Sequence, residues 1–209
     1  MEKIKSTLPN IILSLTSICL IAGVALSAAN KYTASAIAAS KTLALRNAIL
    51  QVTPAFDNNP VEEQYKIAAA ASDSLTFYPA RKGGKYVGCA VESYSKNGFS
   101  GQIRMMIGFD EQGKVFNYTV LEHNETPGLG SKMEAWFRES KNRQSIIGRD
   151  MSKGLLKVNK DGGDVDGITA ATITSRAFLE IINLAYAAIS EGAANGSTTG
   201  ADPVDGTQQ

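Results

Sequence analysis

The sequence predicts an α+β protein, with one N-terminal transmembrane helix followed by a small extracytoplasmic domain in which helices flank an antiparallel sheet. Three observations support this fold class. An uncharged apolar run lies near the N-terminus, two strand-like segments surround a short turn in mid-chain, and an amphipathic helical pattern lies near the C-terminus. A sheet built around a hairpin, with helices before and after it, is typical of α+β proteins.

The composition narrows the classes of function. The 209 residues leave room for one domain of ordinary size besides an anchor and tails. A formal net charge of +1 gives no excess basicity, so we expect no nucleic-acid partner. Two cysteines and one histidine are too few for a zinc site, an iron–sulfur cluster or a metal triad. We therefore expect no metal, no disulfide and no catalytic side chain, and any redox chemistry must belong to a bound group.

The anchor is predicted over Ile11 to Ala29, which contains no charge. At about 1.5 Å per residue, this run comes close to spanning the roughly 30 Å hydrocarbon core of a bilayer. Lys3 and Lys5 precede it, so the positive-inside rule places residues 1–10 in the cytoplasm and the chain after Lys31 outside. We expect a single-pass protein of the inner (cytoplasmic) membrane. A cleaved signal peptide is the alternative, because small residues at A-x-A spacing end the run.

Residues 30–84 are predicted to be a membrane-proximal helical and connecting region. Thr33 to Gln51 has helical spacing of its apolar residues and leads on from the anchor. Thr53-Pro54 should end that helix, since the residue before a proline avoids helical geometry. Val61 to Ser72 is expected to form a short helix, and Lys82-Gly83-Gly84 a turn.

Strand patterns follow in residues 85–190, the predicted functional domain. Lys85 to Tyr94 is rich in β-branched and aromatic residues. Gly101 to Phe109 and Lys114 to Leu121 surround a four-residue turn that contains glycine, which indicates a hairpin. Ser152 to Val158 is expected to be a further strand.

Two helices complete the predicted domain. Ser131 to Phe137 should form a short helix with Ser131 as its N-cap. Thr174 to Ser190 places its apolar residues on one face. The tail, residues 191–209, is small and polar, so we expect it to be disordered.

The segment Asp166 to Thr174 carries the first functional pattern. Gly167 and the small residues after it leave room for a ligand to approach the backbone just before a helix begins, where phosphate binds well. The hydroxyls of Thr169 and Thr172 belong to the same neighbourhood. From the residues alone, an ordinary N-cap at Thr172 or Thr174 remains the alternative.

The loop from Glu125 to Gly130 carries the second pattern. Pro127 fixes one dihedral angle, and two glycines permit tight turns that bring the backbone close to a flat ligand. A plain connecting loop is the alternative interpretation.

Both segments resemble motifs of one protein family. Asp-Gly-Ile-Thr-Ala-Ala-Thr, residues 166–172, resembles the flavinylation motif Asp-x-x-(Ser/Thr)-Gly-Ala-Thr, and Glu-Thr-Pro-Gly-Leu-Gly, residues 125–130, resembles the loop upstream of it. The order of anchor, loop, motif and final helix is similar to the G-subunit of the Rnf electron-transport complex. It also resembles the related C-subunit of the sodium-translocating NADH:quinone reductase.

The resemblance implies that Thr172 is bonded to the phosphate of FMN by a dedicated flavin transferase. It further implies that Asp166 takes part in recognition by the transferase, with Thr169 at the Ser/Thr position and Ala171 at the small position. Ala170 departs from the pattern, which has glycine there. If that position requires a positive φ, alanine costs about 1 kcal/mol or somewhat more.

Flavin contacts beyond Thr172 are expected mainly from the loop. The candidates are Thr126, Gly128, Leu129 and Gly130 from the loop and Thr174 near the phosphate. Glu125 is expected to organise the loop or to tune the flavin potential. We expect His123 to be a solvated loop residue rather than a proton carrier, and Trp136 to anchor the core rather than stack on the flavin.

The leading hypothesis from the resemblance is an electron-carrying FMN subunit of an Rnf-type ferredoxin:NAD oxidoreductase that translocates Na⁺ or H⁺. The implied partners are the other subunits of the Rnf complex, the membrane and, during maturation, the flavin transferase. A quinone-reductase subunit or another exported flavoprotein is the second hypothesis, and a membrane-anchored interaction module without flavin is the third.

Overall fold

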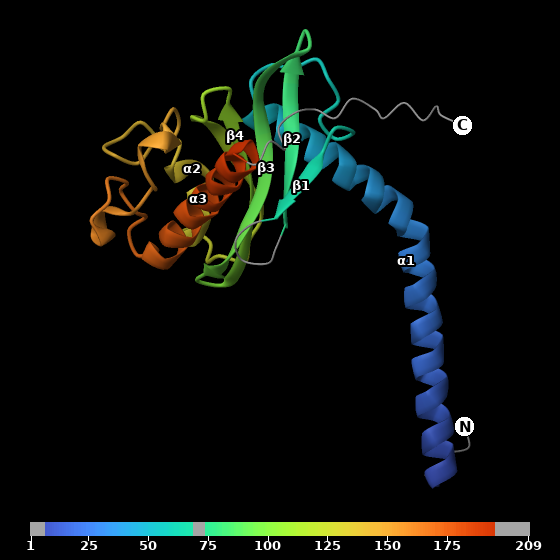
Figure 1. The fold of residues 1–209 in the computed structure, drawn as a ribbon. Helices are drawn as coiled ribbons and strands as arrows, with labels where there is room; N and C mark the ends of the chain where they lie inside the picture. Colours follow the sequence, from blue (N-terminus) through green and yellow to red (C-terminus); the bar gives the residue numbers. More distant parts are fainter. Residues whose placement is uncertain (1–6, 69–73, 195–209) are drawn as a thin grey trace, which may run out of the picture. The chain divides into compact units, whose positions relative to one another are not determined.

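The computed structural model describes residues 7–68 and 74–194 (Figure 1). The chain divides into two compact units, Met1–Leu45 and Arg46–Gln209. Most of the predicted tail lies outside the described residues, but its start at Glu191 continues the last helix as far as Ala194.

The described residues of the first unit form most of one helix, α1 (Leu8–Val52). The stretch Leu8–Ala34 has a mean hydropathy of 2.3 and is long and apolar enough to cross a membrane. It contains the predicted anchor and passes without a break into the second predicted helix, so both predicted segments are helical and belong to one helix. The helix ends directly before Thr53-Pro54, as expected.

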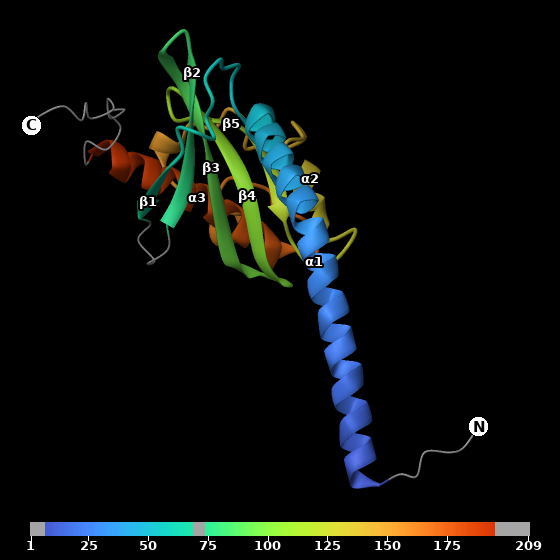
Figure 2. The same ribbon diagram turned by 90° about the vertical axis from the view of Figure 1, so that its right-hand side faces the viewer.

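The second unit contains a five-stranded antiparallel sheet in which every strand pairs with its neighbours in sequence, in the order β1-β2-β3-β4-β5 (Figure 2). The strands are β1 (Tyr65–Ala68), β2 (Ser74–Lys82), β3 (Lys85–Gly98), β4 (Gly101–Asp110) and β5 (Val115–Glu122). The predicted hairpin is confirmed as β4 and β5. Its turn is closed by Gly113 N, which donates to Asp110 O, and by Lys114 N, which donates to the Asp110 carboxylate.

The helix predicted over Val61 to Ser72 is wrong. Tyr65–Ala68 is the edge strand β1, and the last residues of the predicted helix lie outside the described part of the chain. Tyr65 pairs with Phe77 of β2 and stacks on it, with ring centroids 5.6 Å apart. Pairing and stacking across the sheet therefore override the weak local helical preference. The sheet begins at Tyr65, before the predicted domain start at residue 85.

The strand predicted over Ser152 to Val158 is also wrong. The segment starts in a short 3₁₀ helix, η2 (Met151–Lys153), and is otherwise irregular, with one isolated bridge between Val158 and Val165. Leu156 is buried, but its backbone N–H and C=O both pair with the side-chain amide of Asn183, each at 2.9 Å. A helix side chain thus takes the hydrogen bonds that a neighbouring strand would take.

Short helices follow the sheet: η1 (Gly130–Lys132), α2 (Met133–Trp136), η2 and η3 (Asn159–Asp161). The predicted helix at Ser131 is confirmed, but Ser131 does not cap it. Its hydroxyl instead accepts from Gly128 N at 3.0 Å, because the loop folds back over the helix start. The last helix, α3 (Thr172–Ala194), begins at Thr172 rather than at the predicted Thr174.

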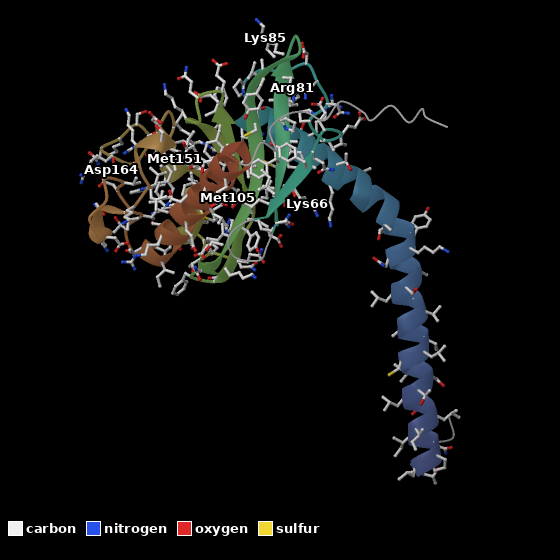
Figure 3. The ribbon with its side chains drawn as sticks, in the orientation of Figure 1. Lys66, Arg81, Lys85, Met105, Met151 and Asp164 are labelled. Carbon is white, nitrogen blue, oxygen red and sulfur yellow. The ribbon has the colours of Figure 1, made fainter. Side chains whose placement is uncertain are left out.

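The core lies between α3 and one face of the sheet (Figure 1). Figure 3 shows Met105 and Met151 inside the domain, whereas Lys85 and Asp164 project from its margins. Cys89 is buried and free, and Cys19 is also free, as predicted.

The end of α1 packs against the opposite face of the sheet at β4 and β5. A Cβ atom at Gly108 would lie 1.5 Å from the carbonyl oxygen of Val52, so only glycine permits this approach. Asn117 adds a hydrogen bond from its side-chain amide to Gln51 O at 2.9 Å.

Candidate functional site

A pocket of about 320 Å³ brings the two sequence patterns together. Its volume lies within the range of roughly 300 to 1,000 Å³ that is usual for small-molecule sites. The lining residues are Phe99, Glu125, Thr126, Leu129, Gly130, Ala170, Ala171, Thr172, Ile173 and Thr174. Segments that are far apart in the chain therefore form one concave surface, and its lining is mostly apolar or small.

The loop side of the pocket is a tight turn. Leu129 N donates to Thr126 O at 3.1 Å, with Pro127 and Gly128 as the two central residues. Gly128 has φ of 76°, which matches the third position of a type II turn, where glycine is favoured after proline. The geometry of this turn thus explains why proline and glycine occupy positions 127 and 128 of the loop.

The motif side of the pocket is a similar turn. Ala171 N donates to Ile168 O at 3.0 Å, with Thr169 and Ala170 in the centre. Ala170 has φ of 62°, so the position does require a positive φ: alanine stands in a left-handed conformation that glycine adopts without strain.

The buried hydroxyl of Ser175 fixes this turn to α3. Its Oγ accepts from Ile168 N and donates to Ala171 O, each at 2.9 Å. Trp136 adds a second connection, since its indole N–H donates to Asp166 O at 2.8 Å. Trp136 packs against the core, which agrees with its predicted anchoring role.

Asp166 holds the start of the motif in place. Its carboxylate accepts from Arg143 N at 3.1 Å and from the side-chain amide of Asn159 at 2.9 Å. Four of the predicted site residues do not line the pocket. These are Asp166, Gly167, Thr169 and Gly128.

Glu125 connects three elements at the base of the pocket. Only 4% of the residue is exposed. Its carboxylate accepts from Thr174 Oγ1 of α3 at 2.7 Å and from Ser100 N, between β3 and β4, at 3.1 Å. At Gly130 a Cβ atom would lie 2.4 Å from Glu125 Oε2, and at Gly98 one would lie 2.8 Å from Oε1. Glycine at both positions leaves room for the buried carboxylate.

His123 is not a solvated loop residue, because only 18% of its side chain is exposed. Its Nδ1 accepts from Glu125 N at 3.1 Å, and its Nε2 lies 3.1 Å from a Glu134 oxygen. The imidazole therefore supports the loop from behind.

The hydroxyls of Thr172 and Thr174 both have partners outside their own helix. Thr174 donates to Glu125, as described above, and Thr172 Oγ1 accepts from Lys160 Nζ at 3.1 Å. Among the hydrogen bonds of the described residues, neither hydroxyl caps α3. The ordinary N-cap interpretation is therefore not supported.

Three residues near the site were not predicted. Phe99 and Ile173 line the pocket with 66% and 47% exposure, and Lys160 contacts Thr172. Ile173 lies inside the motif region and could have been found from its position after Thr172. Phe99 and Lys160 belong to other segments, and no sequence pattern links them to the pocket.

The pocket fits FMN by its chemistry. Gly130, Ala170 and Ala171 let a flat ring approach the backbone, and exposed Phe99 and Leu129 offer apolar contact at the rim. Thr172 is half-buried in the lining and presents a hydroxyl oxygen next to a lysine ammonium, which suits a phosphate.

Comparisons with known proteins show which proteins the chain is similar to. A family described as FMN-binding domain matches residues 98–187, a range that includes the loop, the motif and Lys160. The G-subunit of an ion-translocating oxidoreductase complex from Yersinia pestis is 35% identical over 161 residues, covering 73% of this chain and 76% of the relative.

Two further relatives carry the same description. The protein from Photorhabdus laumondii is 37% identical over 162 residues, covering 73% of this chain and 76% of its own. The one from Shewanella amazonensis is 33% identical over 189 residues and covers 86% of both chains.

Proposed function

The chain belongs to the family of G-subunits of ion-translocating oxidoreductase complexes, and we propose that it carries electrons through one FMN that is bonded by its phosphate to Thr172. Membership of the family makes the chain an electron-carrying, FMN-binding redox subunit of such a complex. The covalent bond, its position and the circuit are the parts that we propose.

One observation carries the proposal. The pocket joins the Glu125–Gly130 loop to residues 170–174, at the end of the motif turn and the start of α3, and Thr172 lies in its lining. A ring that is held in the pocket can therefore have its phosphate at Thr172 without a change of fold.

Attachment requires an activated FMN donor, because a free phosphate monoester has no suitable leaving group. The donor class is a flavin dinucleotide, in which the FMN phosphate belongs to a pyrophosphate. The Thr172 oxygen forms a new bond to the flavin phosphorus, the pyrophosphate P–O bond breaks, and a nucleoside monophosphate leaves. The hydroxyl proton passes to a base of the flavin transferase, and no electrons are exchanged.

Bound FMN supplies one- and two-electron transfer, which the side chains of this protein do not perform. The residues of the chain bind and orient the ring. Phe99, Leu129 and Ile173 exclude water from one edge, while the Glu125 hydrogen bonds keep the loop and α3 at a fixed separation. The covalent bond keeps the ring at high effective concentration beside its pocket.

The circuit is that of an Rnf-type complex, between ferredoxin and NAD, with Na⁺ or H⁺ moved across the membrane. Neighbouring subunits of the complex supply the ferredoxin and NAD sites. The stretch Leu8–Ala34 anchors the chain in the inner membrane in a single pass, with the flavin domain on the extracytoplasmic side. All three relatives described above are G-subunits of ion-translocating oxidoreductase complexes, which favours this circuit over that of a quinone reductase.

The test is co-production of the full chain with the flavin transferase, followed by a denaturing gel viewed under ultraviolet light. Wild-type protein should give a fluorescent band whose intact mass includes one FMN. Thr172→Ala should give no fluorescence, because the accepting oxygen is gone.

Thr169→Ser serves as the control, since it keeps a hydroxyl in the motif and leaves Thr172 in place. It should fluoresce. A dark wild-type band, or a fluorescent Thr172→Ala band, would show that the attachment site is assigned wrongly.

A further inference from the structure

Lys160 is the cation next to the proposed attachment point. Its ammonium nitrogen donates to Thr172 Oγ1 at 3.1 Å, although the lysine lies twelve residues earlier, in η3. A lysine ammonium beside a neutral hydroxyl gains little from the contact, since the charge has no opposite charge to meet.

The acid nearest in sequence is already engaged. The carboxylate of Asp161 forms a two-point contact with the guanidinium of Arg176, at 2.7 and 2.6 Å. The hydrogen bond from Arg176 holds the pKa of Asp161 below its usual value, so this carboxylate stays charged and paired. Among the described residues, Lys160 forms no ion pair with a carboxylate, and its ammonium points to Thr172 alone.

The position of Lys160 is built into the fold. The Asp161–Arg176 pair connects η3 to the first turns of α3, one helical turn beyond Thr172. Gly162 ends η3 in a left-handed conformation with φ of 79°, and a Cβ atom at Gly163 would lie 2.1 Å from Lys157 O. The turn that presents Lys160 is therefore held on both sides.

From this geometry we infer that Lys160 is a positioning residue for the flavin: its ammonium binds the phosphate that Thr172 carries after attachment. The inference rests on the proposed function, because it assigns a partner to the phosphate at that same threonine. Esterification turns the neutral hydroxyl into a phosphodiester with one negative charge. The single positive charge of Lys160 then meets a single negative charge at hydrogen-bond distance, in a charge-assisted contact.

The same contact assists the attachment step. Negative charge builds up on the phosphoryl oxygens as the Thr172 oxygen approaches, and a cation fixed beside that oxygen stabilises it. Lys160 is not among the residues that line the pocket, so its loss should leave the ring contacts intact.

The experiment compares Lys160→Met, Lys160→Gln and Lys160→Arg in the full chain, purified in a phosphorus-free detergent. Lys153→Met is the matched control, because it removes the same charge from an 81% exposed side chain that pairs with Asp150. Flavinylation is followed by intact mass, with purified transferase and a flavin dinucleotide. The phosphorus NMR spectrum of each flavinylated protein reports the surroundings of the phosphate directly.

Lys160→Met and Lys160→Gln should lower the initial rate of flavinylation about tenfold, as expected for loss of a hydrogen bond to a charged group. They should also shift the phosphodiester resonance. Lys160→Arg should restore most of the rate, and Lys153→Met should match wild type in both measurements.

The measurements distinguish failure of the proposed function from failure of the role assigned to Lys160. If wild type gains no FMN mass and shows no phosphodiester resonance, the proposed function itself is wrong. If wild type is flavinylated but both neutral variants keep its rate and its resonance, Lys160 does not bind the phosphate. If the neutral variants lose flavinylation and arginine does not restore it, the lysine acts only through the fold, and the inference also fails.

Discussion

Ala170 departs from the family motif at a position where the backbone of an L-residue is strained. The turn before α3 requires a left-handed residue at this position, and alanine holds φ of 62° there. The left-handed region costs an L-residue roughly 1 to 2 kcal/mol. The matching loop turn places glycine at the same step, at Gly128, without this cost.

Ala170→Gly should therefore stabilise the protein. Relief of the backbone strain outweighs the extra freedom that glycine gives the unfolded chain, and the net gain should be about 0.5 to 1 kcal/mol in the free energy of unfolding. Urea unfolding followed by circular dichroism measures it.

The neighbouring Ala171 provides the control. Its φ lies outside the left-handed region and only 8% of the residue is exposed, so Ala171→Gly should destabilise by about 0.5 to 1 kcal/mol. Equal effects of the two substitutions would contradict the assignment of strain to residue 170.

At the residue scale, the sequence identified one side of the site better than the other. Thr172, Ala170 and Gly130 line the pocket and could be singled out because each is part of a short contiguous pattern. Lys160 and Phe99 could not, since their contacts depend on how η3 and the β3–β4 hairpin fold back on the helix. Asp166 shows the reverse case: it belongs to the motif, yet its carboxylate pairs with backbone and side chains behind the pocket.

At the element scale, the buried Glu125 holds the loop, the β3–β4 hairpin and α3 together. Each of its two oxygens has one donor, and these donors come from two different elements. The arrangement depends on Thr174, a polar side chain of α3 that is only 1% exposed. A buried carboxylate that loses a donor retains the full cost of its desolvation.

Thr174→Val should consequently lower the free energy of unfolding by about 1 to 3 kcal/mol, because the shape is kept while Oε2 of Glu125 loses its donor. Thermal or urea unfolding gives the value. Thr174→Ser retains the hydroxyl and should stay close to wild type. If valine is as stable as serine, the hydrogen bond is not important for joining the loop to α3.

The elements also show what local patterns can predict. The hairpin of β4 and β5 and the amphipathic helix α3 were predictable, since alternation and helical spacing are properties of one segment. The edge strand β1 was not, because its four residues become a strand only by pairing with β2 and stacking Tyr65 on Phe77. The strand wrongly expected over Ser152 to Val158 failed for the same kind of reason, with Asn183 taking its hydrogen bonds.

On the scale of the whole molecule, several ionisable groups are buried in their neutral forms. Burial raises the pKa of the Cys89 thiol from 9.0 to about 11 and that of Tyr78 from 10.0 to about 12, and burial also raises the pKa of Tyr118. All three side chains belong to the folded second unit, and each is at most 3% exposed.

The folded state should accordingly lose stability in alkali. Groups with raised pKa contribute stability that is fully present below their unfolded values of 9.0 and 10.0 and is lost as the pH rises through the folded values. Urea midpoints should be constant up to about pH 9 and then fall progressively. A midpoint that stays level up to about pH 11 would contradict burial of these groups in the neutral form.

The meander order of the sheet has a consequence for how the protein is made. Each strand pairs only with its neighbours in the chain, so the sheet can grow one hairpin at a time during synthesis, from β1 towards β5. The flavin pocket cannot form in this way, because its wall includes residues 170–174 at the start of α3, which follow every strand in the chain. We expect the nascent chain to have a finished sheet before it has an acceptor for flavin. Maturation would then act as a check on folding, since only a chain with its last helix in place presents Thr172 correctly.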